Sequence, residues 1–155
     1  MDKVVCEWVH EKRHKYLKNM FNDKNIPKWE DAIENIDRNK HNMKVLNNFG
    51  FKTLNANYFE CSKIILSDLE KIDSNADSHA YISLLSNSNT FGKHRDIENV
   101  IFLMCTGKVQ FIVWDPEKIT YILERGDVLF IPSGMWHETV TFEPRFGISY
   151  GFVCT

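Results

Sequence analysis

Two short stretches of the chain carry residue types that bind metals. His94-Arg95-Asp96 puts an imidazole and a carboxylate at positions i and i+2, and on a β-strand side chains at this spacing leave the same face. The second stretch runs from Gly126 to His137 and reads Gly-Asp-Val-Leu-Phe-Ile-Pro-Ser-Gly-Met-Trp-His. It predicts an apolar strand between two turns, followed by a histidine. If the intervening residues fold as antiparallel strands, His137 returns beside His94 and Asp96.

Two imidazoles and one carboxylate on one side of a metal leave its other positions open, which is typical of non-haem Fe(II) oxygenases. The H-x-D tripeptide is weak by itself, because a chain with six histidines and many aspartates contains it by chance. The pattern G-D-x-L-x-I-P-x-G-x-x-H is far more specific. Together, in this order, the two stretches predict a metal site at His94, Asp96 and His137.

Length and composition bound the kind of protein. The 155 residues fit one compact domain, so residues 1–155 are expected to form a single domain. Hydrophobic residues make up 43% and charged residues 26%, which is ordinary for a globular protein. The net charge of -2 excludes a broad basic field and argues against nucleic acid as a partner.

The four cysteines are widely scattered and form no C-x-x-C pair, which excludes zinc-finger and thioredoxin sites. Reduced thiols and a cytoplasmic location are therefore expected. The first residues contain no uninterrupted apolar segment of the kind found in secretory signals. No apolar run approaches the roughly 20 residues of a membrane span, so no membrane partner is expected.

The elements that must position these residues fall into two parts. Apolar residues recur at helical spacing in residues 3–22, 27–36 and 43–49, with Pro27 suited to a first helical turn and Gly50 to a helix end. Residues 1–50 are therefore expected to be a helical part. The remainder, 51–155, is expected to form a β-barrel.

Within the second part, residues 51–54 alternate like a strand, 58–66 are ambiguous between strand and helix, and Ser67 to Glu70 match a capping box that predicts the start of a helical turn. Short apolar runs separated by turn residues then predict strands over 81–85, 100–105, 109–114, 119–123, 128–131, 138–142 and 147–153. Such close, regular spacing favours an antiparallel sandwich or barrel, with the helices packed on one outer face.

Residues 81–153 resemble the cupin-fold Fe(II)/2-oxoglutarate oxygenases on their JmjC-like side. The matching elements are His94-x-Asp96, Gly107 before a strand that ends in Trp114, the segment from Gly126 to His137, and the terminal strand over residues 148–152. The resemblance implies a mainly β fold, a double-stranded β-helix (cupin/jelly-roll) barrel. It implies Fe(II) held by His94, Asp96 and His137, with 2-oxoglutarate as cosubstrate. Hydroxylation of a C–H bond in a protein side chain or a small metabolite is the implied reaction.

One position departs from the family pattern. Many JmjC-like members carry Lys or Arg two residues after the glycine that matches Gly107, and that cation pairs with the distal carboxylate of 2-oxoglutarate. Here the position holds Val109, and Lys108 precedes it. Neighbouring strand residues point to opposite faces, so Lys108 should not simply substitute. Arg145 is the first candidate for this cation and Lys108 the second.

Arg145 shares a predicted strand face with three small residues, Gly147, Ser149 and Gly151. A cation among small residues leaves room for a small acid. Other candidates complete the predicted site: Ser149, Tyr81 and Thr90 as further cosubstrate contacts, and Asn99 and Trp136 as residues of the substrate pocket.

Other functions stay open at this point. A cupin that binds metal without 2-oxoglutarate turnover is the main alternative, motivated by Val109 and the short chain. A metal-dependent isomerase or a different cupin dioxygenase fits less well, since those resemble three-His or three-His-plus-Glu sets. The substrate is not specified by the sequence, and a homodimer is expected only as a general tendency of short chains.

Overall fold

The computed structural model describes residues 2–21, 25–39, 41, 44–46, 51–88 and 90–154. Three helices are present in this part of the chain: α1 (Asp2–Glu11), α2 (Trp29–Arg38) and α3 (Glu60–Leu69), the last preceded by a 3-10 turn, η2 (Ala56–Tyr58). None of these described helices is both long and apolar enough to span a membrane.

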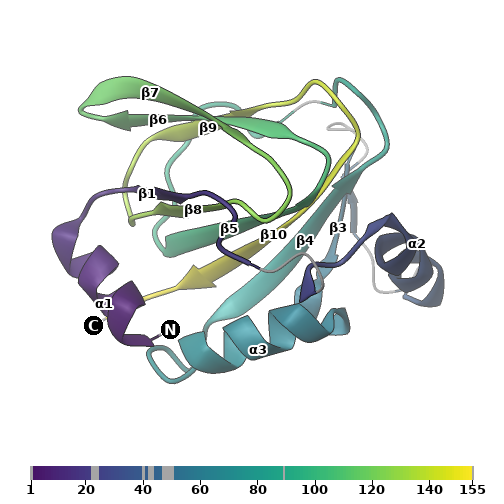
Figure 1. The fold of residues 1–155 in the computed structure, drawn as a ribbon, viewed down its shortest axis with the longest axis horizontal. Coiled ribbons are helices and arrows are strands. Elements are labelled where there is room, and N and C mark those ends of the chain that lie inside the picture. The colour runs from purple at the N-terminus through teal and green to yellow at the C-terminus, as the bar shows by residue number, and fades with distance from the viewer. Residues whose placement is uncertain are drawn as a thin grey trace.

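The described residues form ten strands in two antiparallel sheets that face each other (Figure 1). The larger sheet has the order β1-β8-β5-β10-β4-β3-β2 and the smaller β7-β6-β9. The bounds are β1 (Lys15–Leu17), β2 (Lys44–Leu46), β3 (Phe51–Asn55), β4 (Asp77–Ser83), β5 (Asn99–Thr106), β6 (Val109–Asp115), β7 (Glu117–Leu123), β8 (Val128–Ile131), β9 (His137–Val140) and β10 (Arg145–Phe152). The predicted antiparallel barrel is confirmed.

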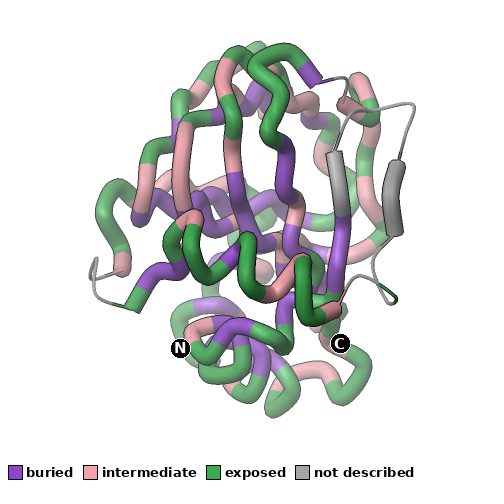
Figure 2. Tube along the Cα trace, turned by 90° about the vertical axis from the view of Figure 1, so that its right-hand side faces the viewer, coloured by how far each residue is buried: buried purple, intermediate pink, exposed green. Residues whose placement is uncertain are grey.

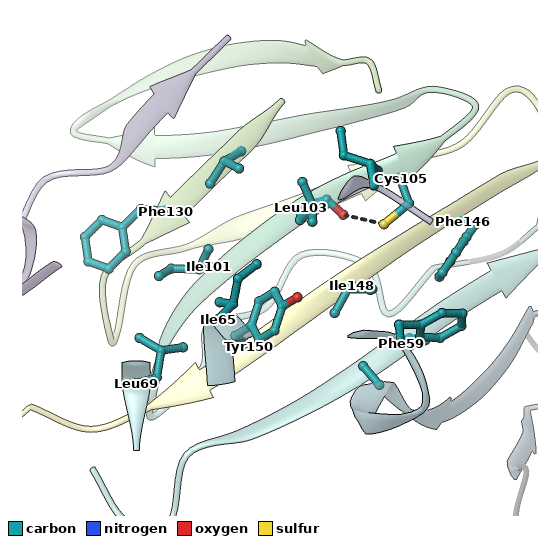
Figure 3. Packing of buried hydrophobic residues seen from close by; sticks show 14 of the residues in the cluster. Phe59, Ile65, Leu69, Ile101, Leu103, Cys105, Phe130, Phe146, Ile148 and Tyr150 are labelled. Atoms are coloured by element: carbon teal, nitrogen blue, oxygen red, sulfur yellow. Dashed lines mark hydrogen bonds between the residues drawn. The ribbon is translucent and has the colours of Figure 1, made fainter. Parts of the chain in front are cut away.

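The large sheet is covered on both faces, and the alternation along β10 shows how. Phe146, Ile148, Tyr150 and Phe152 are fully buried and pack against apolar residues of the helices, among them Ile65 and Leu69 of α3 (Figure 3). Residues of the opposite face point between the two sheets, where a second cluster forms around Phe111, Leu129 and Ile131. Figure 2 shows the resulting buried stretches along the strands and on the inner sides of the helices. Helices on one outer face, as predicted, leave the interior of the barrel free for a site.

The N-terminal helix is shorter than the pattern of residues 3–22 predicts. It ends at Glu11, and Tyr16 and Leu17 belong to β1, which pairs with β8 at the edge of the large sheet. Asn22 lies outside the described residues. The prediction is wrong beyond Glu11 because long-range contacts override the local apolar spacing.

Asp127 makes these contacts. Its side chain is buried and accepts hydrogen bonds from the Tyr16 hydroxyl at 2.8 Å and from the backbone N–H groups of Asn19 at 2.9 Å and Glu124 at 3.0 Å. The aspartate of the Gly126-Asp127 turn therefore fastens the N-terminal segment to the barrel, a role that the sequence pattern alone did not indicate.

Two further predictions in the first part need correction. The second helix exists as α2, but Pro27 lies before its N-cap residue, Lys28. The helix expected over residues 43–49 is wrong at Lys44–Leu46, which form β2 and pair with β3. The remaining residues of that prediction, with Gly50, lie outside the described part.

The ambiguous segment 58–66 belongs mostly to α3, and Ser67 to Glu70 close this helix instead of starting one. Ile65, Leu66 and Leu69 are buried on one side of α3. Because this apolar stripe runs to Leu69, packing against the sheet extends the helix through the capping-box pattern and overrides it.

Gly107, in the turn between β5 and β6, has φ +77°, and a Cβ built on it would overlap the carbonyl oxygen of Pro144. Gly134 has the same φ of +77° with open space around its missing Cβ. Left-handed backbone costs a non-glycine residue about 1–3 kcal/mol. We expect Gly107→Ala to lower the free energy of unfolding clearly more than Gly134→Ala, as measured by urea denaturation. Equal losses would contradict the overlap with Pro144.

Candidate metal centre

A single antiparallel bridge brings the two predicted histidines together. His94 lies outside the named strands and pairs with His137, the first residue of β9. The backbone N–H of His94 donates to the carbonyl of His137 at 2.9 Å, and the reverse bond measures 2.8 Å. The N–H of Gly134 donates to the carbonyl of Asp96 at 2.8 Å. These bonds fix the two segments side by side. The prediction that His94 and Asp96 lie on a regular strand is wrong, because both lie outside the named strands.

The side chains of His94, Asp96 and His137 converge, with one potential ligand atom of each within 4.8 Å of the others. The His94 Nε2 lies 3.9 Å from Asp96 Oδ1, and the His137 Nε2 lies 3.4 Å from Asp96 Oδ2. Two nitrogens and one carboxylate oxygen on one side of a common point suit Fe(II) and leave other coordination positions open.

Backbone carbonyls orient both imidazoles in the same way. The Nδ1 of His94 bonds to the carbonyl of Gly92 at 2.8 Å, and the Nδ1 of His137 to that of Met135 at 3.2 Å. A carbonyl oxygen only accepts, so in each ring Nδ1 carries the proton and Nε2 keeps its lone pair for the metal. Burial lowers the pKa of His137, whose residue is 4% exposed, and this favours the neutral form that binds metals.

The three side chains line one part of a cavity of about 410 Å³ inside the barrel. Much of its wall is apolar, supplied by Val100 and Phe102 of β5, Val109 and Phe111 of β6, and Ile131 of β8. Small-molecule sites are commonly of this size and character.

Arg145, at the start of β10, is the one cation among the described residues that line this cavity. Its Nη1 donates a hydrogen bond to the Ser88 hydroxyl at 2.6 Å, and the Ser88 carbonyl accepts one from the Thr141 hydroxyl at 2.6 Å. Burial lowers the pKa of Arg145 to about 10, so the guanidinium remains charged at neutral pH. The cavity therefore brings together three potential metal ligands and a positioned cation.

Small residues on the same face of β10 leave space beside the guanidinium of Arg145. Gly147 and Ser149 line the cavity beside Arg145, and a Cβ on Gly147 would overlap the ring of Phe102. Gly151 does not line the cavity. Its missing side chain leaves space for the carboxylate of Glu98, whose Oε2 would lie 2.5 Å from a Cβ there.

Lys108 lies away from the cavity. Its Nζ is 2.6 Å from the Glu124 Oε1, and this hydrogen bond raises the pKa of the lysine. Val109 points into the cavity, as strand alternation predicts. Its side chain is apolar, so the usual family position supplies no charge.

Three further predicted residues also line the cavity: Tyr81, Thr90 and Ser149. Burial, with a smaller contribution from the negative charge of Asp96, raises the pKa of Tyr81 to about 12. The phenol therefore keeps its proton at neutral pH and has a hydroxyl to donate.

Asn99 and Trp136 are not among the residues that line the cavity. Asn99 is buried at the start of β5, where its side chain donates to the Phe152 carbonyl at 3.3 Å and accepts from the Ser133 N–H at 3.1 Å. Trp136 is 43% exposed and lies against the guanidinium of Arg95, 5.3 Å from the ring centre. Closeness in sequence to a metal ligand thus did not place either side chain in the cavity.

The structure adds cavity residues that the sequence did not predict, among them Phe91 and Thr139 beside the apolar wall. The Phe91 ring meets the rings of Tyr81 and His94 edge-on, at 6.4 and 5.9 Å between centres. Thr139 lies two residues after His137 on β9, and strand periodicity alone could have identified it. For Phe91, which lies in no strand, no such signal exists.

Comparison with known proteins identifies a family whose model matches most of the chain. The family described as JmjC domain matches residues 52–155. No curated protein sequence matches the chain.

Solved structures share the fold. The ribosomal oxygenase YcfD from Escherichia coli, in a structure with cobalt and 2-oxoglutarate, is 20% identical with a TM-score of 0.71, over 97% of this chain and 52% of that one. A second YcfD structure is 18% identical with a TM-score of 0.71, over 97% and 53% of the two chains. A Pseudomonas putida prolyl-4-hydroxylase is 12% identical with a TM-score of 0.69, over the full length of both. The chain thus spans about half the length of the YcfD structures, and the predicted cupin barrel is confirmed.

Proposed function

The chain belongs to the JmjC domain family, and on that premise we propose that it is an Fe(II)- and 2-oxoglutarate-dependent dioxygenase that hydroxylates a C–H bond. The observation that carries this proposal is the pairing, in one cavity, of the ligand set His94, Asp96 and His137 with the buried cation Arg145. A dicarboxylate that reaches a metal with one end and a guanidinium with the other fits this arrangement.

In this proposal the ligand set holds Fe(II), which with 2-oxoglutarate and O₂ supplies the oxidising chemistry. The chain's own residues bind, orient and exclude water. Arg145 pairs with the distal carboxylate, and its hydrogen bond to Ser88 holds the guanidinium in place. Tyr81, Thr90 and Ser149 offer hydroxyl groups along the cavity. The intact acid, Asp96, argues for hydroxylation or demethylation and against halogenation.

We further propose that the substrate is a protein side chain. Support comes from the names of two structures that share the fold, a ribosomal oxygenase and a prolyl-4-hydroxylase. A cytoplasmic location is consistent with the four cysteines, none of which forms a disulfide in the described part of the chain. The homodimer expected from the sequence stays a prediction.

Anaerobic titration of the Fe(II)-loaded protein with 2-oxoglutarate tests the proposal. We expect a visible metal-to-ligand charge-transfer band, because the cosubstrate would chelate the metal while Arg145 holds its far end. Succinate should then form when O₂ is admitted. If Fe(II) is bound and neither signal appears, the proposal fails, and the chain is instead a cupin that binds metal without 2-oxoglutarate turnover.

A further inference from the structure

Cations and aromatic rings gather on the outer side of the metal site. Trp114 follows the buried Val113 on β6, so its side chain faces away from the barrel interior. The Lys93 Nζ lies 3.8 Å from the centre of the Trp114 ring and 5.6 Å from that of Trp136, and the Arg95 guanidinium lies 5.3 Å from Trp136. We use the term basic rim for a group of five residues: Lys93, Arg95, Ile97, Trp114 and Trp136.

The charges of the basic rim are not neutralised within the part of the chain that the structure describes. The described ion pairs include neither Lys93 nor Arg95. Cation–π contacts hold the two cationic groups over the rings without cancelling their charge. Cations held in this way lose less conformational freedom when an anionic group binds, which favours binding.

Apolar surface lies beside these charges. Ile97 directly follows the ligand Asp96 and is 90% exposed, and Trp136 directly precedes the ligand His137 and is 43% exposed. Burying such side chains against a partner is favourable. The basic rim therefore suits an occupant that combines carboxylates with apolar groups.

A polypeptide fits the surroundings better than a nucleic acid. The chain has a net charge of -2. Glu98 and Asp77 lie at Gly151, where their carboxylate oxygens would be 2.5 and 3.0 Å from an added Cβ. Asp77 belongs to β4 of the large sheet and Glu98 directly precedes β5, and the negative charge of Asp77 acts on Tyr81 of the cavity. A uniformly charged phosphate backbone would be repelled there, whereas the charge of a polypeptide varies from residue to residue.

We propose that the basic rim binds an acidic and apolar segment of a polypeptide substrate and so directs a neighbouring side chain of that polypeptide to the metal centre. The fate of that side chain rests on the proposed function, but the binding itself requires no turnover. Lys93 and Arg95 are the charged contacts, and Ile97 and Trp136 are the apolar ones.

Fluorescence anisotropy with labelled peptides tests this proposal on the metal-loaded chain. Three peptides share one Gly-Ser-Leu frame and differ only in whether their variable positions are Asp, Asn or Lys. We expect the Asp peptide to bind about 5-fold more tightly than the Asn peptide, the effect of two exposed ion pairs of ordinary strength. The preference should shrink in concentrated salt, because exposed charges are screened.

Two sets of variants separate the basic rim from overall charge. The double variant Lys93→Gln with Arg95→Gln should lose the preference for the Asp peptide. The double variant Lys3→Gln with Lys18→Gln removes the same charge from exposed positions elsewhere and should keep it. Charge reversal, Lys93→Glu with Arg95→Glu, should shift the preference to the Lys peptide, a gain that misfolding cannot produce.

Several outcomes would overturn the proposal: equal binding of the Asp and Asn peptides, a preference that survives neutralisation of Lys93 and Arg95, or tighter binding of a single-stranded oligoribonucleotide than of the Asp peptide. Failure of the proposed function looks different. A chain that prefers the Asp peptide but never forms succinate refutes the oxygenase and leaves the basic rim intact.

Discussion

His94→Ala is expected to abolish retention of Fe(II) and formation of succinate together. The substitution removes one of three ligands whose nitrogen and oxygen atoms lie within 4.8 Å of one another. Loss of an outer partner of a metal ligand alone costs about 10–100-fold in metal affinity, so loss of the ligand itself should cost at least about 100-fold. Equilibrium dialysis with Fe(II) under anaerobic conditions measures the first effect, and a succinate assay the second.

His79→Ala is the matched control for this experiment. His79 lies in β4, and its 3.7 Å approach to Asp77 is an exposed pair outside the three potential metal ligands. Removal of its imidazole should leave Fe(II) binding unchanged. Substantial succinate formation by His94→Ala, or equal loss of Fe(II) in both variants, would refute the assignment of the metal centre.

The sequence predicted well which side chains of β6 and β10 face the cavity, because strand geometry is local and regular. Alternation placed Arg145 with Gly147 and Ser149 on one face of β10, and the structure has all three lining the cavity. It also placed Val109 and Lys108 on opposite faces, as observed. A period of two residues, once the strand is recognised, fixes which side chains point inward.

Where prediction failed, contacts distant in sequence decided the structure. The apolar spacing of residues 3–22 indicates a helix, yet the buried carboxylate of Asp127 binds Tyr16 and Asn19 and holds this segment as an edge strand. Nothing within residues 3–22 reveals a partner more than a hundred residues away. The same holds for Ser88, which reaches Arg145 from a loop.

Closeness in sequence to a metal ligand was the least reliable basis for predicting residues of the pocket. Asn99 and Trp136 were expected in the pocket because they lie close to metal ligands in the chain. Asn99 instead ties the end of β10 to the turn at Ser133. Trp136 is next to His137 on an extended segment, so its side chain leaves on the opposite side and joins the basic rim.

The buried guanidinium of Arg145 is expected to determine the affinity for 2-oxoglutarate. Arg145→Ala should raise the concentration of 2-oxoglutarate needed for half-saturation by about 100-fold, because truncating one partner of a buried charge pair costs about 2–5 kcal/mol. Fe(II) binding should stay unchanged, since no metal ligand is touched. Arg145→Lys should recover part of the affinity, because lysine keeps the charge and loses the planar fork of donors. The charge-transfer band, followed during anaerobic titration, measures each affinity.

Lys108→Ala decides between the two candidate cations. Lys108 is paired with Glu124 away from the cavity, whereas Arg145 lines it, so Lys108→Ala should change the affinity for 2-oxoglutarate less than about 2-fold, as for ordinary surface substitutions. The reverse result, a large loss in Lys108→Ala and none in Arg145→Ala, would mean that the turn after β5 rearranges on binding. A large loss in Arg145→Ala alone would instead show that β10 of the large sheet supplies the charge that Val109, on β6 of the small sheet, lacks. The cation can then change strands while the ligand set stays in place, because the cosubstrate needs only a positive charge at the right distance from the metal.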